Sequence, residues 1–434
     1  MSRAGTGASR GMNEAALWVY YEDRRVGRAD LHDGDRLSFV YDSDWLAHGG
    51  AFALSQSLPL RERGFGPEVA HAFFENLLPE GGAREMIAAQ LGISVENDVA
   101  LLAALGEETA GAFRIVGAET QTKQRFANAR VRRILTTSEL ERWADGEPVG
   151  WAEESGEPPR LSLAGAQHKM ACIREGDHYV VPASHEASTH ILKFDSLRFR
   201  HLSVNEFLTM RFAAALGLPV CHVDLDVGAS TPFLVVERYD RRDLDGATVR
   251  LHQEDFCQVF ALSRHRKYQS EGGPTLLEIG RRLGEVSTQA AKDLVNLLRW
   301  VMFNALSGNA DGHAKNLSLL YGARGPCLAP FYDLVCTRAI EGVHTGLAMA
   351  VDGEVNADRL RPRHFEALAE GWDMRPALAT RELERLLGQR KRAWETALAA
   401  LHEHVEYSPA VERVERAMEQ RARALENNLR QDRP

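Results

Sequence analysis

Long apolar stripes at helical spacing in the last third of the chain constrain its fold most strongly. From residue 288 onward, apolar residues recur every three or four positions in three separate stretches, which is the pattern of helices that bury one face. The members of these stripes are Leu294, Leu297, Leu298, Val301 and Met302; Leu383, Leu386, Leu387, Trp394, Leu398 and Leu401; and Val411, Val414, Met418 and Leu425. The sequence therefore predicts a large helical C-terminal lobe.

Short β-prone segments dominate the part of the chain before this lobe. Two of them, at residues 16–21 and 36–41, flank a polar stretch and predict a small antiparallel sheet near the N-terminus. Four more strand-like segments follow at residues 170–174, 178–182, 189–194 and 232–238. Sheets followed by a helical lobe indicate an α+β protein.

Two helices are predicted among these strands. Residues 67–91 carry apolar residues at helical spacing behind Pro67, which suits a first helical turn. A second helix follows Ser203 and Glu206, whose S-x-x-E spacing matches a capping box, and Gly217 ends it.

The composition is that of a globular protein. Of the 434 residues, 44% are hydrophobic, yet no apolar run reaches the roughly 18 residues that span a bilayer. The five cysteines are an odd number without CxxC spacing, which argues against a disulfide framework or a zinc site. With 52 basic and 61 acidic side chains the net charge is −9, which disfavours binding of nucleic acid over the whole surface. We expect a cytoplasmic protein without a membrane partner.

Polar segments predict the limits of the folded parts. The small, Gly-rich residues 1–13 predict a flexible tail. The acidic stretch around residues 145–160, which contains Gly and Pro, predicts a domain boundary or a long loop.

The densest cluster of chemically useful side chains is GNADGHAKN at residues 308–316, directly after an apolar helix. Asp311 and Asn316 have the D-x-x-x-x-N spacing of a protein-kinase catalytic loop, and Asp333 follows seventeen residues later. A carboxylate can accept the proton of an attacking hydroxyl, while amide and carboxylate oxygens can hold Mg²⁺. Each residue alone is more often a turn or helix cap, but the three together favour phosphoryl transfer.

Three upstream segments fit the same chemistry less specifically. Lys193 alternates with apolar residues on a predicted strand, as a phosphate-binding lysine does, although a lone strand lysine is more often solvated. Residues 235–240, VVERYD, end an apolar strand in a polar linker, as an adenine-binding hinge requires. The small residues of SLAGAQHK, at 162–169, let a backbone approach phosphates, but the chain has no Walker A motif, which argues against a P-loop NTPase.

With these segments the sequence resembles the HipA family of serine/threonine kinases, the toxins of bacterial type II toxin–antitoxin modules. The resemblance runs from about Leu17 to about residue 425. The matching stretches, in chain order, are FFENLLPEG, SLAGAQHK, THILKFD, VNEFLTMRFAAALGL, VVERYDR, LHQEDFCQ, KYQSEGGP, NADGHAKNLSLL and LAPFYDL. Their number and order make the resemblance specific.

The resemblance implies a protein-kinase-like bilobal fold with a small N-terminal β-rich subdomain and a large helical C-terminal lobe. The implied parts are an N-terminal HipA subdomain at residues 14–150, an ATP-binding small-lobe part at 151–245 and a helical catalytic lobe at 246–434.

The resemblance also implies ATP and Mg²⁺ as cofactors and a role for particular residues. Asp311 is implied as the catalytic aspartate, with Asn316 and Asp333 holding Mg²⁺. The residues implied to bind ATP or to lie beside it are Lys193, Glu237, Tyr239, Gln253 and His313. Ser162 is implied as an inhibitory autophosphorylation site, because a phosphate adds nearly two negative charges to a loop beside the ATP phosphates. His168 stands where the family usually has glutamate.

A partner and a target follow from the same resemblance. The implied partner is a HipB-like helix-turn-helix antitoxin, which supplies most of the contact with operator DNA and so fits the net charge of −9. The implied substrate is an aminoacyl-tRNA synthetase, typically the glutamyl enzyme, whose phosphorylation arrests translation and growth and leads to persistence. Two alternatives stay open at this point. One is a catalytically silent co-repressor scaffold for a DNA-binding antitoxin, and the other is a kinase of a different substrate on the same fold.

Overall fold

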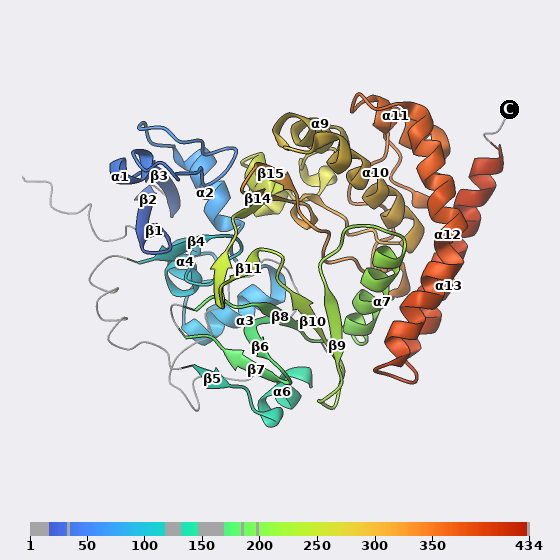
Figure 1. Cartoon of the computed structure of the whole chain (residues 1–434), viewed down its shortest axis with the longest axis horizontal. Helices are drawn as coiled ribbons and strands as arrows, with labels where there is room; N and C mark the ends of the chain where they lie inside the picture. Colours follow the sequence, from blue (N-terminus) through green and yellow to red (C-terminus); the bar gives the residue numbers. More distant parts are fainter. Residues whose placement is uncertain are drawn as a thin grey trace, which may run out of the picture.

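The computed structural model describes residues 17–32, 35–117, 132–145, 169–183, 186–196 and 199–431. The predicted tail, Ser162, His168 and all but the first residue of the predicted boundary at 145–160 lie outside the described residues. Figure 1 shows an N-terminal domain, a central sheet and a helical lobe in one molecule. Within the described ranges, no helix is both long and apolar enough to cross a membrane.

An antiparallel sheet packed on helices forms the N-terminal domain. Its strand order is β3-β2-β1-β4. The elements are β1 (Leu17–Tyr21), β2 (Arg24–His32), β3 (Arg36–Tyr41), α1 (Ser43–Leu46), α2 (Pro67–Glu75), α3 (Gly81–Leu91), α4 (Asp98–Leu105) and β4 (Phe113–Val116). Sheet and helices share one hydrophobic core, which includes Phe39, Phe73 and Phe74. The predicted N-terminal sheet is confirmed, and the polar stretch between the two predicted strands contains a third strand, β2, which pairs with both.

The helix predicted over residues 67–91 is in fact two helices. α2 ends at Glu75 with Asn76 as its C-cap, and α3 begins only at Gly81. Pro79 explains the break, because proline lacks an N–H and disfavours helical backbone in the residue before it. The break places Asn76 and Glu80 in a short connection that contacts the C-terminal lobe.

A six-stranded sheet forms the centre of the molecule, in the order β5-β7-β6-β8-β10-β9. All its neighbouring strands are antiparallel. The elements here are β5 (Arg133–Ile134), α6 (Thr137–Ala144), β6 (Lys169–Glu175), β7 (His178–Val181), β8 (His190–Lys193), α7 (Leu202–Ala215), β9 (Val223–Asp226) and β10 (Phe233–Glu237). Trp143 of α6 packs near Phe194 in the core of this sheet, and α7 packs against β9 and β10.

Two small β structures follow the central sheet. The hairpin of β11 (Arg241–Leu244) and β12 (Ala247–Arg250) turns at Asp245 and Gly246, which both have positive φ, as a tight Asp-Gly hairpin turn requires. A three-stranded sheet of β13 (Gln253–Asp255), β14 (Ser318–Gly322) and β15 (Gly325–Leu328) interrupts the helical region, where no strand was predicted.

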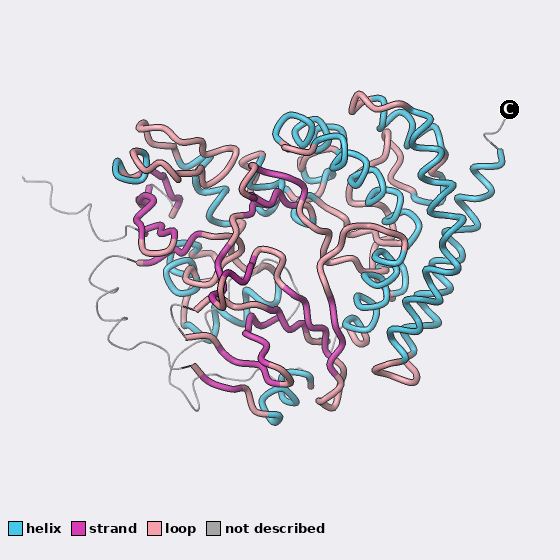
Figure 2. Tube along the Cα trace, viewed as in Figure 1, coloured by secondary structure: helices cyan, strands magenta, loops and turns pink. Residues whose placement is uncertain are grey.

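The remaining helices form the C-terminal lobe, and Figure 2 shows the longer ones gathered on one side of the molecule. They are α8 (Phe256–Val259), α9 (Leu276–Val286), α10 (Ala290–Ser307), α11 (Pro362–Glu370), α12 (Pro376–His402) and α13 (Pro409–Gln431). The three predicted apolar stripes lie in α10, α12 and α13 and contribute to one continuous core. The predicted helical lobe and the α+β class are confirmed. All five cysteines are free thiols, in line with the absence of a disulfide framework.

Candidate active site

Lys193, at the end of β8, is the centre of the polar site. Its Nζ donates hydrogen bonds to Glu206 Oε1 at 2.6 Å and to Asp333 Oδ1 at 2.7 Å. Lys193 and Glu206 are only 7% and 1% exposed, and buried charges of this kind need charged partners. The contacts therefore join the central sheet, α7 and the loop after β15 at one point.

The capping box predicted from Ser203 and Glu206 is wrong. α7 begins at Leu202, and both the backbone N–H and the hydroxyl of Ser203 donate to Asp195 Oδ1 at 2.8 Å. Because Asp195 takes the place that the glutamate has in a capping box, Glu206 turns toward Lys193 instead. Asp195 has thus replaced Glu206 as the side chain that caps this end of α7.

The three charges shift one another's ionisation. Burial raises the pKa of Glu206 to about 7, although Lys193 opposes the shift. Burial also acts to raise the pKa of Asp333, but Lys193 and Lys169 hold it well below its ordinary value. Burial acts to lower the pKa of Lys193, but Asp333 and Glu206 outweigh this effect and raise it. Asp333 and Lys193 are thus both charged at neutral pH.

The loop after α10 brings Asn316 to Asp333. α10 ends at Ser307, and Gly308 terminates it with a φ of 74°, a left-handed conformation that favours glycine. Asn316 Nδ2 donates to Asp333 Oδ2 at 3.0 Å, and Asn316 Oδ1 accepts a hydrogen bond from the His313 backbone at 3.3 Å. Asn316 and Asp333, both implied as Mg²⁺ ligands by the HipA resemblance, are therefore in direct contact.

Asp311 lies in the same loop with its side chain exposed. Its backbone N–H donates to Asn309 Oδ1 at 3.0 Å, which fixes the turn, and Tyr268 Oη donates to its Oδ1 at 2.6 Å. Partial loss of hydration and the charge of Asp333 raise the pKa of Asp311, while the Tyr268 hydrogen bond opposes the shift. An accessible carboxylate with a raised pKa can accept a proton from an approaching hydroxyl.

Asn316 and Asp333 fit a Mg²⁺ ion by their chemistry. Mg²⁺ prefers oxygen ligands and is commonly held by one or two protein groups together with phosphate oxygens. The ionised side chain of Asp333 is 41% exposed, and the Asn316 amide lies beside it. The pair thus offers one charged and one neutral oxygen-bearing group side by side.

Comparison with known proteins decides the family. The profile of the HipA-like C-terminal domain matches residues 161–398, and that of the HipA N-terminal domain matches residues 17–116. The chain belongs to the HipA family. The serine/threonine-protein kinase toxin HipA of Shewanella oneidensis is 33% identical over 389 residues, which cover 85% of this chain and 86% of that protein. Y4mE of Sinorhizobium fredii, to which a kinase activity is attributed, is 38% identical over 363 residues, which cover 83% of this chain and 85% of that protein.

The fold of HipA agrees with that of this chain over nearly its whole length. A solved structure of HipA from Shewanella oneidensis MR-1, in complex with HipB and operator DNA, has a TM-score of 0.79 and 28% sequence identity. The superposition covers 95% of this chain and 97% of the HipA chain. It confirms the α+β fold of HipA. The identity with the serine/threonine-protein kinase toxin HipA places this chain among the serine/threonine kinases of that family.

The residues that the HipA resemblance implied on the ATP side fall into two places. The Tyr239 hydroxyl donates to Gln253 Oε1, and the Tyr239 ring stacks on Tyr332 with 5.7 Å between the ring centroids. Tyr332 directly precedes the aspartate that contacts Lys193, so this aromatic pair borders the site. Glu237 ends β10 with an exposed side chain that faces His222 at 3.8 Å rather than the aromatic pair.

His313 is buried inside the loop that follows α10. Burial lowers its pKa to about 3, so the imidazole is neutral. Its ring packs edge-on against Tyr268 at 5.1 Å, and its Nδ1 has no hydrogen-bond partner among the described residues. The ring of His313 therefore packs against Tyr268, which lies in a neighbouring segment of the chain.

Three residues at the site escaped the sequence analysis. Glu206 was hidden by the apparent capping box, and Tyr268 lies in the KYQSEGGP motif, which matched the family without a role. Lys169 ends the SLAGAQHK motif and pairs with Lys193 across β6 and β8. Burial and the charge of Lys193 lower the pKa of Lys169 to about 8. Motif membership was the signal that could have found Tyr268 and Lys169.

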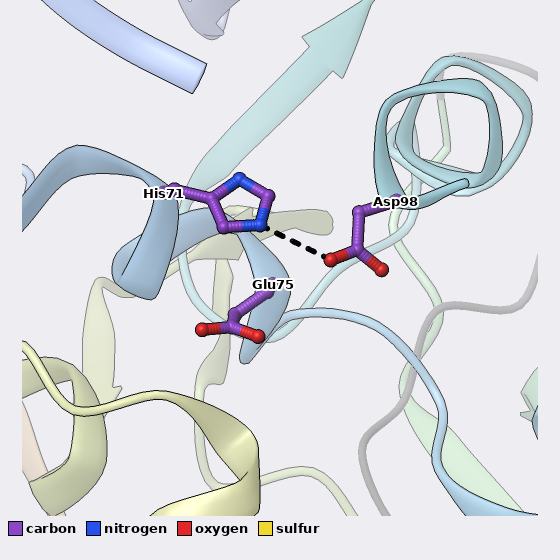
Figure 3. Close-up of side chains that lie close together, drawn as sticks. All are labelled: His71, Glu75 and Asp98. Atoms are coloured by element: carbon purple, nitrogen blue, oxygen red, sulfur yellow. Dashed lines mark ion pairs between the residues drawn. The ribbon is translucent and has the colours of Figure 1, made fainter. Parts of the chain in front are cut away.

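A second polar cluster joins the N-terminal domain to the helical lobe. Figure 3 shows His71 and Glu75 of α2 near Asp98 of α4. Their ligand-type atoms lie within 4.8 Å of one another, an arrangement that can hold a metal. Other side chains of the same chain already contact these atoms, however. Arg264 Nη1 lies 2.8 Å from Asp98 Oδ1 and 3.3 Å from Glu75 Oε2, Arg84 also pairs with Asp98, and His71 Nε2 lies 3.2 Å from Asp98 Oδ2. With two guanidinium groups neutralising its carboxylates, the cluster is an ion network between domains.

Proposed function

We propose that this protein is an ATP- and Mg²⁺-dependent serine/threonine protein kinase and the toxin of a cytoplasmic toxin–antitoxin pair. The observation that carries the proposal is one connected set of contacts, in which Lys193 bridges Glu206 and Asp333 while Asn316 hydrogen-bonds to Asp333. Protein kinases use a lysine–glutamate pair, a metal-binding aspartate and a metal-binding asparagine for phosphoryl transfer. The four side chains here supply that set in a single site.

Each side chain at the centre has a distinct task in this proposal. Lys193 binds the phosphates of ATP, and Glu206 fixes the direction of its ammonium group. Asn316 and Asp333 hold Mg²⁺, which when bound neutralises negative charge on the phosphates. Asp311 orients the hydroxyl of a serine or threonine and accepts its proton as the phosphate is transferred.

Tyr268 bears on how the substrate reaches Asp311. Its hydroxyl occupies, at 2.6 Å, a hydrogen-bonding position that an acceptor hydroxyl also needs. A bound serine or threonine therefore replaces the phenol on the same carboxylate oxygen. The Tyr268 contact keeps Asp311 oriented until the substrate arrives.

The nucleotide base is proposed to lie on the other side of Lys193. Tyr239 and Gln253 border this side through their mutual hydrogen bond and the stacked ring of Tyr332. Glu237, at the end of β10, belongs to the hinge through its backbone, and His313 supports the catalytic loop from within.

The proposed partners extend the family assignment. The solved HipA relative is in complex with HipB and operator DNA, so we propose a HipB-like helix-turn-helix antitoxin here, with most of the DNA contact made by the antitoxin. The net charge of −9 supports a complex in which the antitoxin, and not this chain, makes most of the DNA contact. The proposed substrate is an aminoacyl-tRNA synthetase of the glutamyl type, and the proposed off-switch is autophosphorylation of Ser162.

Incubation of the purified protein with Mg²⁺, γ-labelled ATP and a cell lysate tests the proposal. A discrete labelled protein that contains phosphoserine or phosphothreonine supports it, and phosphoproteomics after brief induction then identifies the target against an Asp311→Ala control. Label confined to small metabolites contradicts a protein substrate. The absence of both ATP turnover and labelled protein favours the silent co-repressor scaffold.

A further inference from the structure

Lys315, in the catalytic loop, is held mainly by the N-terminal domain. It is 7% exposed, and its Nζ donates to the backbone oxygen of Asn76 at 3.1 Å and to Asn76 Oδ1 at 2.9 Å. It also forms an ion pair with Glu80 Oε1 at 2.8 Å. The carboxylate of Asp255, in its own lobe, lies farther away at 3.8 Å. A buried ammonium group next to the metal-side asparagine thus depends on residues more than 230 positions earlier in the chain.

Glu80 holds a second segment of the catalytic lobe at the same time. Its Oε2 accepts a hydrogen bond from Lys267 Nζ at 2.7 Å. Lys267 directly precedes Tyr268, whose hydroxyl contacts Asp311, and the backbone oxygen of Lys267 accepts from Ala314 N–H at 3.3 Å. One carboxylate therefore ties together the two segments that surround the catalytic aspartate.

The position of Lys315 is coupled directly to the site. It is the central residue of the short 3₁₀ turn Ala314–Asn316, and its backbone oxygen accepts a hydrogen bond from Tyr332 Oη at 2.7 Å. A displacement of Lys315 therefore moves Asn316, which follows it, and Tyr332, which precedes Asp333. Loss of a charged partner from a buried ammonium group favours such a displacement, because the ammonium group then moves toward the next carboxylate, that of Asp255.

We propose that Glu80 of the N-terminal domain is a positioning residue for phosphate transfer, which holds the catalytic loop through Lys315 and Tyr268 through Lys267. The inference rests on the proposed kinase function and adds that the N-terminal domain completes the active site. Glu80 itself lies outside the reacting groups, and its effect passes through the two lysines. Small displacements of such groups reduce catalytic rates strongly, because the reacting atoms must meet in a narrow geometry.

A neighbouring carboxylate provides a matched comparison. Glu75, at the end of α2, also crosses from the N-terminal domain to the catalytic lobe, where it accepts from Arg264 at 3.3 Å and from Ser263 Oγ at 3.2 Å. Among the described residues, the hydrogen-bond partners of Glu75 lie outside the catalytic loop. Glu75→Gln and Glu80→Gln thus remove the same charge from the same interface, but only the second releases the loop.

The experiment measures kcat, KM for ATP, affinity for a non-hydrolysable ATP analogue and melting temperature for wild type, Glu75→Gln, Glu80→Gln and Glu80→Asp. Glu80→Gln should lower kcat by about 10- to 100-fold, while KM for ATP and analogue affinity should change much less than kcat, because the Lys193–Glu206 pair is untouched. Glu80→Asp keeps the charge and should recover part of the lost kcat. Glu75→Gln should lower the melting temperature by a comparable amount and leave kcat within about twofold.

Several results overturn the inference. A kcat of Glu80→Gln within twofold of wild type does so, as do equal kcat losses in Glu75→Gln and Glu80→Gln, which indicate a general weakening of the interface. If Glu80→Gln does not fold, Lys267→Gln decides: a lower kcat at unchanged KM for ATP supports the inference, and an unchanged kcat overturns it. An inactive wild-type enzyme refutes the proposed kinase function instead, so the two failures are distinguishable.

Discussion

Replacement of Glu206 by glutamine removes one negative charge from the pair that holds Lys193 and keeps the size of the side chain. Lys193 is then left with Asp333 as its charged partner at 2.7 Å. Because Asp333 is also the proposed metal ligand, the lysine and the metal compete for one carboxylate in the variant. We expect weaker binding of the ATP phosphates and slower transfer.

The size of the effect follows from the contact that is lost. The Lys193–Glu206 hydrogen bond is 2.6 Å long, and Glu206 is only 1% exposed. A hydrogen bond to a charged group contributes about 1.5–3 kcal/mol, and each 1.36 kcal/mol changes a rate tenfold. The expected loss in kcat/KM for ATP is therefore about 10- to 150-fold. Since the pKa of Glu206 is about 7, wild type loses part of the same charge below neutral pH, and the loss should be larger at pH 8 than at pH 6.

The assay is the initial rate of phosphate transfer from γ-labelled ATP at several ATP concentrations, at pH 6 and pH 8. Glu175→Gln is the control, because Glu175 is an exposed glutamate on β6 in the same sheet. It should behave as wild type. A Glu206→Gln enzyme whose kcat/KM stays within twofold of wild type at pH 8 refutes the role assigned to the pair.

Four further predictions concern the metal, a buried acid, the substrate contact and the off-switch. Removal of divalent cations with EDTA should abolish transfer, and added Mg²⁺ should restore it. Burial raises the pKa of Glu254 to about 7 from its ordinary 4.5, so the folded state binds this proton more tightly than the unfolded state. As the pH rises from about 4.5 to 7.5, the free energy of unfolding of the wild type should therefore fall by about 3 kcal/mol relative to that of Glu254→Gln, at about 1.4 kcal/mol per pKa unit. Urea unfolding of both proteins at about pH 4.5 and 7.5 measures this difference. Tyr268→Phe should lower KM for the protein substrate about threefold or more, because the acceptor hydroxyl no longer displaces a phenol from Asp311; an unchanged KM contradicts this competition. Ser162→Ala should stay active and be more toxic in cells, and unchanged toxicity together with an unphosphorylated wild-type Ser162 counts against the proposed off-switch.

Local patterns predicted the elements of the fold where one face of an element is apolar. The stripes of α10, α12 and α13 were visible because buried residues recur at helical spacing. The strand Arg24–His32 was missed because its polar residues, among them Arg24, Arg25 and Arg28, hide the few apolar positions that the sheet buries. The single helix predicted over residues 67–91 failed at Pro79, whose effect on the backbone outweighed the apolar period.

The residues of the candidate site likewise fall into those that local sequence patterns predicted and those that they did not. Asp311, Asn316 and Asp333 stood out in the sequence because they are close together in the chain. In the structure Asn316 contacts Asp333 across the β14–β15 hairpin that lies between them in the chain. Glu206 could not be assigned from local sequence, because S-x-x-E describes a capping box equally well until the tertiary partner is known. The Glu80–Lys315 pair joins two domains and leaves no local pattern at all.

The central claim is that Asp311 and its neighbours transfer phosphate from ATP to a protein hydroxyl. Its most direct test compares purified wild type with Asp311→Asn, which keeps the shape of the side chain and removes its ability to accept a proton, in a γ-labelled ATP assay with Mg²⁺. We predict labelled phosphoserine or phosphothreonine with wild type and a loss of about 100-fold or more with the variant, while both proteins bind an ATP analogue equally well. Equal transfer rates for the two proteins, or no transfer by wild type, would contradict the account.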